Sequence, residues 1–438
     1  MPDIAEFGKS LDGALFSPGS PGYEAIRRPV NSAYREVRPR LVVTCRSVSD
    51  VVGAVRYATA TGDRLVPRGG GHCFAGRSST DGILLDVSGL DGIGVADDGA
   101  ATIGAGARLA QVYAALHTYG RTLPAGCGPT VGITGLTLGG GIGLLGREHG
   151  LTCDRLAGAQ VVLPSGSVVD CDRDHEPDLF WALRGAGGGQ FGVVTSLRFD
   201  TVREPMTTRI EAHWPDIALE DLVDAWQAWA PDAPDGLTVN LTLDAEPGAP
   251  VQATLFGAAT LEEGLARELL AEFTDRAGVA HGIELRTGLP YHQLKQTFAD
   301  PRGDRAVRIR SEFFSHAMSG RTLASLLAQL GSSRTRGRRQ LAFTAMGGAY
   351  NRVAEDATAF AHRSERFLLE HIADPAEPWV DRSWATAHAD GSGRVYPNFP
   401  DPALDNWAAA YHAGNYPRLA AVKNAYDPDR FFDFPQAI

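Results

Sequence analysis

The chain lacks three features that would each assign it to a large class of proteins. It contains no run of about 20 apolar residues, so a membrane-spanning helix and a membrane partner are not expected. An excess of positive charge is also missing, because 41 lysines and arginines stand against 52 aspartates and glutamates. A nucleic-acid partner needs a concentrated positive surface, and the net charge of −11 argues against one. The first residues have neither the basic start nor the apolar core of a signal peptide, so we expect a cytoplasmic protein.

Cysteine is scarce and widely spaced. The five cysteines occupy positions 45, 73, 127, 153 and 171 and form no Cys-x-x-Cys pair. This spacing predicts neither a disulfide framework nor a structural zinc site. His149 and Cys153 have the separation of two ligands on one helix face, but Gly150 interrupts that face and no second ligand pair is near. We therefore interpret them as packing residues and predict no metal site.

Glycine, by contrast, is abundant and clustered. The most informative stretch is Arg68-Gly69-Gly70-Gly71-His72-Cys73-Phe74-Ala75-Gly76, which follows the apolar run 65–67. Three successive glycines expose backbone N–H groups that can surround a phosphate. His72 places a nucleophilic imidazole directly after them, which suggests a covalently held cofactor. Taken alone, such a stretch is more often a surface turn with an incidental histidine.

Two further glycine clusters favour the cofactor interpretation. Residues 124–146 contain nine glycines and no charged residue, and the apolar side chains between the glycines require burial. A solvated linker would carry serines and charges instead. A third cluster, at 185–189, leads into a strand-like run. The glycines at 139–143 superficially suggest a dinucleotide fingerprint, but no clear helix follows and no acidic residue lies about 20 positions on, which makes a Rossmann dehydrogenase a weak competitor.

These clusters resemble the FAD-linked oxidases of the vanillyl-alcohol-oxidase fold, in particular the berberine-bridge-enzyme-like family. The matching stretches, in the family's order and spacing, are Arg68–Gly76, Gly82–Leu90, Pro124–Gly143, Asp178–Val194 and Tyr396–Ile438. The resemblance implies an α+β chain with a two-part FAD-binding domain of the PCMH type and a substrate domain whose mixed or antiparallel sheet is covered by helices. The expected divisions are an N-terminal lead-in at 1–36, the FAD-binding domain at 37–203, the substrate-binding domain at 204–385 and a C-terminal return to the FAD domain at 386–438.

FAD is the cofactor that the resemblance implies. His72 would bond to the 8α-methyl of the flavin ring, and the loop from Arg68 to Gly71 would hold the pyrophosphate. The full set of expected FAD-binding residues is Arg68, Gly69, Gly70, Gly71, His72, Cys73, Gly76, Ser78, Gly126, Cys127, Thr130, Val131, Gly132, Gly135, Leu138, Gly139, Gly140, Gly143, Val193, Val194, Tyr396 and Asn398.

Cys127 departs from the family's pattern. Many relatives carry a second flavin link through a cysteine in the order Pro-Ala-Gly-x-Cys-Pro-Thr-Val-Gly. Here the cysteine comes one residue earlier, and Gly128 occupies the linking position. A shift of one residue reverses the direction of a side chain in an extended segment. We therefore predict a single link through His72, and we expect Cys73 to point away from the flavin if its loop is fully extended.

Tyr396 is the predicted general base. It lies in Arg394-Val395-Tyr396-Pro397-Asn398, which resembles the family's Tyr-x-Asn motif beside the flavin ring. To act at neutral pH, its pKa would have to be lowered from about 10. Asn398 would orient the ring or the tyrosine. From composition alone, a tyrosine packed at a proline-bounded strand end is an equally good interpretation, and Tyr350 and Tyr291 are further possible contributors.

Local patterns predict the regular elements. A helix capped at Ser49-Asp50 and ending near Gly62 should lie between strands at 41–43 and 65–66, followed by a strand at 83–87. Other helices are expected at 109–117, 179–183, 261–277, 322–330 and 354–372. Further strands are expected at 159–163, 168–171, 209–214, 237–243, 251–256, 307–314 and 340–344. Trp214, Phe313 and Phe314 are expected to fill a core.

The predicted activity is that of an FAD-dependent oxidase. It would take a hydride from a small-molecule alcohol, a sugar hydroxyl or an amine carbon, and dioxygen would reoxidise the cofactor to give hydrogen peroxide. A flavin dehydrogenase or oxidative cyclase with another acceptor is an alternative. A non-catalytic flavin-binding protein is a second alternative, although the presence of both Tyr396 and Asn398 argues against it.

Overall fold

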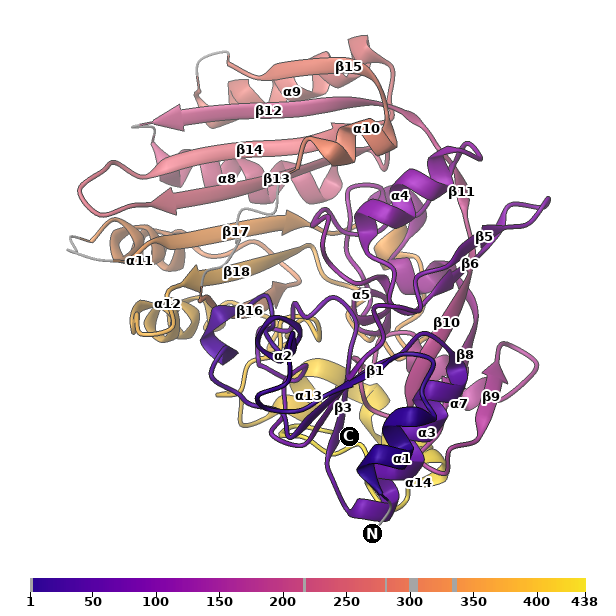
Figure 1. Cartoon of the computed structure of the whole chain (residues 1–438). Helices are drawn as coiled ribbons and strands as arrows, with labels where there is room; N and C mark the ends of the chain where they lie inside the picture. The colour runs from indigo at the N-terminus through magenta and orange to yellow at the C-terminus, as the bar shows by residue number, and fades with distance from the viewer. Residues whose placement is uncertain (1–2, 216–217, 280–281, 299–305, 333–336) are drawn as a thin grey trace.

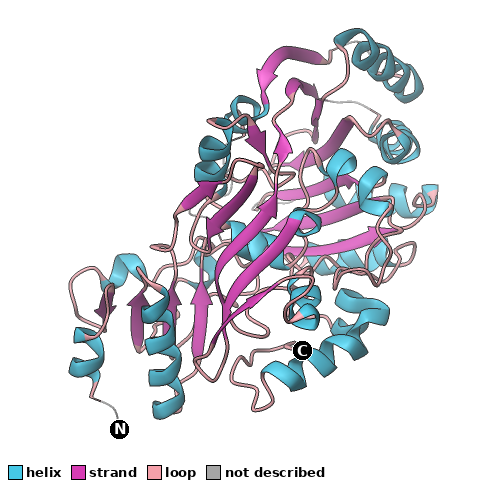
Figure 2. Ribbon diagram, turned by 90° about the vertical axis from the view of Figure 1, so that its right-hand side faces the viewer, coloured by secondary structure: helices cyan, strands magenta, loops and turns pink. Residues whose placement is uncertain are grey.

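Three larger sheets organise the chain, two in its first half and one in its second (Figure 1). The computed structural model describes residues 3–215, 218–279, 282–298, 306–332 and 337–438. Figure 2, a quarter turn away, shows strands running through the middle of the molecule and helices along its outer side. The relative position of these sheets decides where a site can form.

The first sheet has four strands in the order β1 (Ala14–Phe16), β2 (Leu41–Thr44), β4 (Ile83–Asp86) and β3 (Leu65–Arg68). β2, β4 and β3 are parallel, and helix α3 (Val48–Thr61) connects β2 to β3, so the predicted strand–helix–strand unit is confirmed. The cap lies at Ser47 rather than at Ser49-Asp50. The Ser47 hydroxyl accepts from the Asp50 N–H (3.3 Å), and the Asp50 carboxylate accepts from the Ser47 N–H (3.2 Å). Asp50 therefore lies in the first turn of the helix, where its side chain completes a capping box, instead of preceding the helix.

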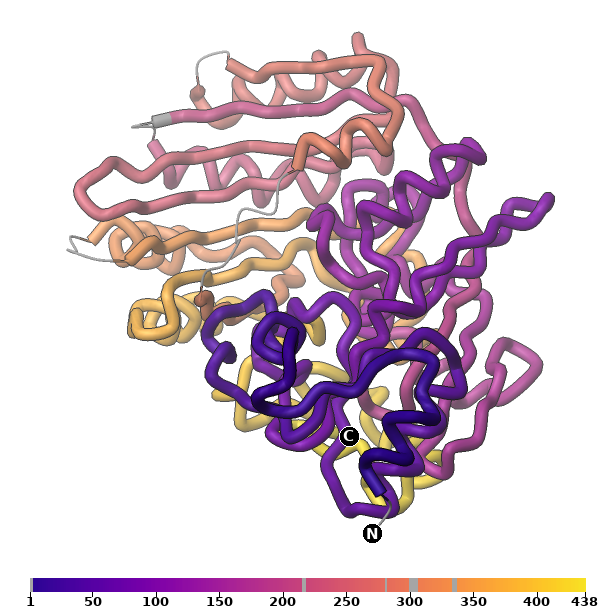
Figure 3. The backbone as a smooth tube through the Cα atoms, in the orientation of Figure 1, coloured from indigo at the N-terminus to yellow at the C-terminus, as the bar shows by residue number. Residues whose placement is uncertain are grey.

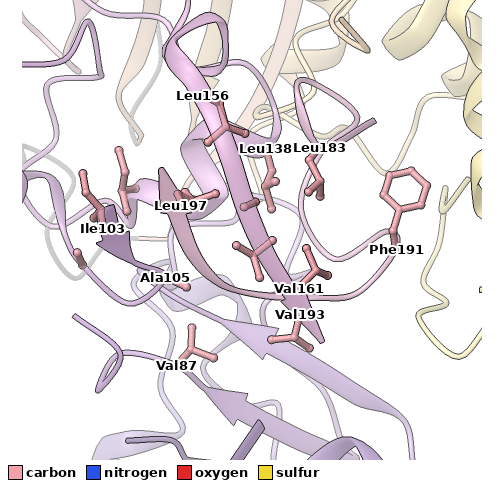
Figure 4. Packing of buried hydrophobic residues seen from close by; sticks show 14 of the residues in the cluster. Val87, Ile103, Ala105, Leu138, Leu156, Val161, Leu183, Phe191, Val193 and Leu197 are labelled. Atoms are coloured by element: carbon pink, nitrogen blue, oxygen red, sulfur yellow. The ribbon is translucent and has the colours of Figure 1, made fainter. Parts of the chain in front are cut away.

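The second sheet is antiparallel, in the order β5 (Ile93–Val95), β6 (Ala100–Gly104), β10 (Val193–Asp200), β8 (Leu156–Val162) and β9 (Val168–Cys171). Helices α4 (Leu109–His117), α5 (Ile133–Leu138) and α7 (Pro177–Leu183) belong to the same region, and β7 (Arg121–Thr122) pairs with β11 (Val202–Arg203). Figure 4 shows buried side chains from both sheets meeting in one core, among them Val87, Ile103 and Val193. The glycine clusters lie at the border of this core.

The third sheet has seven strands, and every neighbouring pair is antiparallel. Its order is β15 (Glu284–Pro290), β12 (Met206–Pro215), β14 (Gln252–Ala259), β13 (Leu237–Ala245), β17 (Arg339–Ala345), β18 (Phe367–Ala373) and β16 (Arg308–Phe314). Its helices are α8 (Leu219–Trp229), α9 (Glu263–Ala277), α11 (Gly320–Gly331) and α12 (Trp379–His388), which lie behind the sheet in Figure 1. Side chains of one sheet face and of these helices form a second core that includes Trp214 and Phe314. The opposite face is left for the site.

The predicted helix at 354–372 is wrong. Residues 352–366 form turns and irregular backbone, and 367–373 form β18 between β17 and β16. All seven residues of β18 are buried, including Glu370 and His371. A strand that is covered on both faces carries no alternation of apolar and polar residues, and its leucines and glutamate are also good helix formers. The local sequence therefore favoured the wrong element.

The C-terminal stretch returns to the first core, as Figure 3 shows for the yellow end of the chain. Helices α13 (Trp407–His412) and α14 (Tyr416–Tyr426) precede the last residues, and Leu419, Phe432 and Ile438 pack into the core of the first two sheets. Lys423 and Asp427 form a buried ion pair of 2.7 Å there. The domain boundaries that we expect stay a prediction. Within the described residues, no helix has the length and apolar character to cross a membrane.

One buried arginine connects the two halves of the molecule. Arg147, in helix α6 (Gly146–His149), donates to the carbonyl oxygens of Leu237 (3.1 Å) and Pro231 (2.8 Å). Its guanidinium also donates to the carbonyls of Ala233 and Met346. All four acceptors belong to the part of the chain that carries the third sheet, whereas α6 directly follows the second glycine cluster. The glycine-rich loop is thus fixed against the third sheet.

Candidate active site

A cavity of about 550 Å3 lies between the glycine loops and the open face of the third sheet. This volume falls within the range of about 300–1,000 Å3 that is typical of small-molecule and cofactor sites. One wall comes from residues 65–78, 126–144 and 187–194, and the other comes from β13, β14, β17 and β18. Residues 396–400 and 432–434 complete the lining. All three glycine clusters therefore meet at one site.

We call the wall formed by residues 65–78, 126–144 and 187–194 the flavin-side wall, and it is built from close backbone approaches. A Cβ on Gly70 would overlap the backbone nitrogen of Gly132, and a Cβ on Gly132 would lie 2.6 Å from the nitrogen of Gly70. Gly71 has a φ of +71°, a conformation that glycine adopts without the steric cost of a side chain. The two loops therefore meet backbone to backbone, an approach that side chains at these positions would prevent.

His72 faces the second glycine loop. Its Nε2 lies 2.9 Å from the Thr130 hydroxyl, and the residue is half-buried in the cavity wall. Cys73 lines the same cavity, and the Gly76 N–H donates to the Cys73 carbonyl (3.4 Å). This contact closes a turn, so the loop is not fully extended and the condition under which Cys73 would point away from the flavin does not hold.

Tyr396 and Asn398 reach the same loop from the C-terminal segment. The Tyr396 hydroxyl oxygen accepts from the N–H groups of Gly141 (3.0 Å) and Ile142 (3.2 Å) and from the Asn398 amide (2.9 Å). Asn398 also donates to the Leu136 carbonyl (2.9 Å), and a Cβ on Gly139 would overlap its side-chain oxygen. Asn398 therefore holds the tyrosine in position, as predicted.

The pKa of Tyr396 differs from the expectation. Burial raises the pKa of this phenol to about 12, while the three N–H donors act in the opposite direction. The residues around Tyr396 therefore do not provide the lowering of its pKa that a base at neutral pH would require. The donors instead mark where a negative charge on the phenol oxygen would be stabilised.

Most of the expected FAD-binding residues line this cavity. They are Arg68, Gly69, Gly70, Gly71, His72, Cys73, Ser78, Gly126, Cys127, Val131, Gly132, Gly135, Leu138, Gly143, Val193, Val194, Tyr396 and Asn398. Four others support the lining from behind: Gly76 against the Tyr34 ring, Thr130 against His72, Gly139 against Asn398 and Gly140 against Phe360. The Arg68 guanidinium is turned toward Asp86 (3.0 Å) and the Arg27 carbonyl (2.8 Å). Arg68 therefore stabilises the start of the loop and does not offer its charge to a pyrophosphate.

Two tyrosines that seemed possible contributors have structural positions. The Tyr350 hydroxyl donates to the Gly143 carbonyl (2.8 Å) and accepts from the Gly143 N–H (3.2 Å). Tyr291 is buried and meets the Tyr113 ring edge to face, 5.7 Å between centroids. Phe313 is also buried, in a cluster with Tyr396 and Leu368. Tyr350 thus fixes the loop that Tyr396 contacts.

We call the wall formed by β13, β14, β17 and β18 the substrate-side wall. The predicted site residues included none of its side chains. Thr238 and Asn240 on β13, Phe256 on β14, Thr344 on β17, and Leu368 and Glu370 on β18 line the cavity. Residues alternating with them, such as Leu241, Phe343 and Leu369, belong to the core under the helices. Glu370 is only 7% exposed. A glutamate within the apolar run 367–373 is a sequence signal for such a position. Because that run was interpreted as a helix, the sequence did not indicate that Glu370 faces the cavity.

Comparison with known proteins now decides the family. Residues 39–172 match the family described as FAD binding domain, and residues 395–438 match the family described as berberine and berberine like. An uncharacterized FAD-linked oxidoreductase of Bacillus subtilis, YgaK, is 31% identical over 98% of this chain and 97% of its own length. The chain belongs to the berberine-bridge-enzyme-like family. Both matched regions supply walls of the cavity.

Other members of the berberine-bridge-enzyme-like family extend the comparison. The chitooligosaccharide oxidase of Gibberella zeae is 29% identical over 91% of this chain and 87% of its own. The solved structure of Physcomitrella patens BBE-like 1 superposes with a TM-score of 0.91 at 25% identity and covers 100% of this chain and 99% of that one. Glucooligosaccharide oxidase from Acremonium strictum, whose structure is described with a 6-S-cysteinyl, 8α-N1-histidyl FAD, superposes with a TM-score of 0.88 at 24% identity, over 100% and 99% of the two chains. The protein is therefore an FAD-linked oxidoreductase with a PCMH-type FAD-binding domain.

The residues of the cavity fit FAD. Gly70 and Gly132 form a cradle that side chains would close, and a half-buried imidazole and a buried tyrosine face the same space. The glycine loops of the first two sheets are the elements that would hold the cofactor, and the third sheet is left to face a substrate.

Proposed function

We propose that the protein is an FAD-dependent oxidase for a small-molecule substrate with an oxidisable hydroxyl or amine carbon, sugar hydroxyls included. The observation that carries this proposal is the cavity in which His72, Tyr396 and the polar sheet residues meet. A relative 29% identical to this chain is a chitooligosaccharide oxidase, which supports a hydroxylated substrate. The hydroxyls of Thr238 and Thr344 and the amide of Asn240 suit hydrogen bonding to such a molecule.

The cofactor is proposed to be held by a single covalent bond from His72. When bound, FAD supplies the acceptor for the substrate's hydride, and dioxygen then takes the electrons as hydrogen peroxide. His72 lies next to the glycine cradle, and its contact with Thr130 fixes the ring in the cavity wall. The backbone amides of the two glycine loops are proposed to bind the phosphates, since the guanidinium of Arg68 is engaged elsewhere.

Tyr396 is proposed as the proton acceptor. When the hydride leaves the substrate carbon, the hydroxyl proton passes to the Tyr396 oxygen, and the product is a carbonyl compound. The Gly141 and Ile142 amides and the Asn398 side chain stabilise the charged form of the acceptor. Burial works against that form, so the donors must offset part of its cost.

Glu370 is a second candidate for the same step. It is a buried carboxylate on β18 and lines the same cavity from the opposite wall. A carboxylate in this place could accept a proton directly or orient the substrate hydroxyl. The pH profiles of the wild type and of Glu370→Gln separate these roles.

The experiment that tests the proposed function combines cofactor mapping with a product assay. Acid-precipitated protein should stay yellow, and peptide mass mapping should place the flavin on the His72 peptide. His72→Ala should lose the covalent link and keep some non-covalent FAD. Substrates from a panel of oligosaccharides and other alcohols should yield hydrogen peroxide. A colourless precipitate would remove the covalent link, and turnover with an artificial acceptor but not with dioxygen would indicate a dehydrogenase.

A further inference from the structure

Lys295 is a buried lysine next to the flavin cavity. It belongs to α10 (Tyr291–Gln296), at the end of β15, and is only 4% exposed. Its Nζ donates to the carbonyl oxygens of Ala125 (3.1 Å) and Gly126 (3.0 Å) and lies 3.3 Å from the Cys127 sulfur. A side chain from the substrate half therefore contacts three consecutive residues of the second glycine loop.

The contacts of Lys295 match the charged form of the side chain. An ammonium has three N–H donors and no acceptor, and three acceptors are present around the nitrogen. In this form each of the three N–H groups has an acceptor. The nitrogen also lies 5.1 Å from the centre of the Tyr113 ring and 4.9 Å from that of Tyr291, contacts that favour a cation.

A buried ammonium needs a negative partner. Burial lowers the pKa of Lys295, and the Cys127 sulfur acts against that lowering. No carboxylate is among its hydrogen-bond or ion-pair partners within the described residues, and its two other polar contacts are neutral carbonyls. Among the neighbours that the described residues provide, the group that can supply the charge is therefore the Cys127 sulfur.

Within the described part of the chain, the other titratable groups recorded around Cys127 are phenols. Tyr113 comes from α4, Tyr291 from α10, and Tyr350 from the short helix Gly348–Asn351. Burial raises the pKa of Tyr113 and Tyr291 well above the ordinary value, and it raises that of Tyr350 as well. These phenols therefore stay protonated at neutral pH and do not neutralise the ammonium.

We propose that Lys295 is a positioning residue that holds Cys127 as a thiolate in the wall of the flavin cavity. Cys127 lines the cavity, and its loop also carries Thr130, whose hydroxyl contacts His72. The sulfur thus lies on the same stretch of wall as the proposed attachment point of the flavin ring. No bond to the flavin is formed in this arrangement. The placement of the ring rests on the proposed function, whereas the Lys295–Cys127 pair does not.

The proposed Lys295–Cys127 pair predicts a reactive Cys127 and a spectral signature in the holoenzyme. A thiolate is the nucleophilic form of cysteine, and a neighbouring lysine favours it. In the holoenzyme, a thiolate next to the oxidised flavin should give a charge-transfer shoulder at wavelengths beyond the flavin's own bands. Iodoacetamide should alkylate Cys127 at neutral pH faster than an ordinary thiol. Cys73 lines the same cavity and serves as an internal control for access.

The test compares holoenzyme of the wild type with Lys295→Met, Lys295→Arg and Cys127→Ser, by visible spectra against pH and by peptide-mapped alkylation. We expect Lys295→Met to slow alkylation of Cys127 by about tenfold or more at pH 7 without changing Cys73. The long-wavelength shoulder should be weaker at pH 7 in this variant than in the wild type. Lys295→Arg should keep both properties in large part, and Cys127→Ser should abolish the shoulder at every pH.

Two results would overturn the pair. One is an alkylation rate and a spectrum that are the same in wild type and Lys295→Met, both folded with unchanged Cys73 access. The other is flavin found covalently on the Cys127 peptide, because the sulfur would then be a thioether. A colourless protein with rapid, Lys295-dependent alkylation would support the pair and would contradict the proposed flavin function, so the two failures are distinguishable.

Discussion

The two walls of the cavity are built in different ways. The flavin-side wall consists of backbone, with Gly70 and Gly132 so close that neither position accepts a side chain. The substrate-side wall consists of side chains that alternate along the strands of an antiparallel sheet, such as Asn240, Thr344 and Glu370. A backbone wall suits a cofactor that every member of a family shares, and a side-chain wall can change residue by residue. Substrate specificity can therefore vary at the side-chain wall without loss of the cofactor.

The largest effect is expected where the two walls are joined. Tyr396→Phe removes the hydroxyl that contacts the Gly141 and Ile142 amides and faces the cavity. If this oxygen accepts the substrate proton, anaerobic reduction of the flavin by substrate should slow by about 10²–10⁴-fold, while flavin content stays the same. Stopped-flow absorbance measures the rate. Tyr119→Phe, at a side chain that is 60% exposed, is the control, and an unchanged rate in Tyr396→Phe would exclude it as the base.

Gly70→Ala tests the backbone wall. The new Cβ would overlap the Gly132 nitrogen, so the loops must separate at a cost of about 1–3 kcal/mol. We expect a lower flavin-to-protein absorbance ratio and a lower melting temperature. Gly135→Ala is the matched control, because Gly135 lines the same cavity but a Cβ there meets nothing within 4 Å. Equal flavin loss in both variants would show that the close approach at Gly70 is unimportant.

The pH dependence separates the proton acceptors on the two walls. The raised pKa of Tyr396, about 12, means that its basic form is scarce at neutral pH and increases as the pH rises. With Tyr396 as the base, kcat/KM should rise about tenfold per pH unit through the neutral and mildly alkaline range. Glu370→Gln should lower the rate and keep that slope. A profile that is flat above neutral pH in the wild type, together with inactive Glu370→Gln, would assign the step to Glu370.

Thr344→Val should give the smallest effect, on the side-chain wall alone. Removal of one hydroxyl that lines the cavity should raise KM about two- to tenfold, the range of a lost hydrogen bond, and leave flavin content unchanged. Thr254→Val is the control, since Thr254 lies on β14, contacts His213 and does not line the cavity. Steady-state kinetics with the best substrate measures both variants. Identical KM values would place the substrate away from β17.

The same contrast explains what the sequence could predict. A wall of backbone can be predicted from the sequence because only glycine permits it, and the stretches 68–76 and 124–146 indicate the flavin side. The strand–helix–strand unit and helix 109–117 were also predictable, because each had a clear apolar period and a terminal signal. The Tyr-x-Asn motif indicated the residues that join the two walls, although not the rise in the Tyr396 pKa.

The substrate side depended on tertiary information. Glu370 lies in a strand that is buried on both faces, so its sequence contains no alternation that would show which side chains face the cavity. Lys295 lies in a helix of six residues and acts on Ala125 and Gly126, about 170 positions away in the chain. No local pattern specifies a contact over that distance. The charged form proposed for Lys295 rests on the three acceptors and the two aromatic rings around its nitrogen, which come from distant parts of the chain.

The Arg147 contacts affect how the protein unfolds. Separation of the two halves would break four hydrogen bonds of one buried guanidinium, and any of these groups that stayed buried would be costly to leave unpaired. The cofactor half and the substrate half should therefore unfold in one cooperative transition. Partial unfolding should therefore not leave one half with a working part of the site. Each molecule should have either the complete cavity or no cavity.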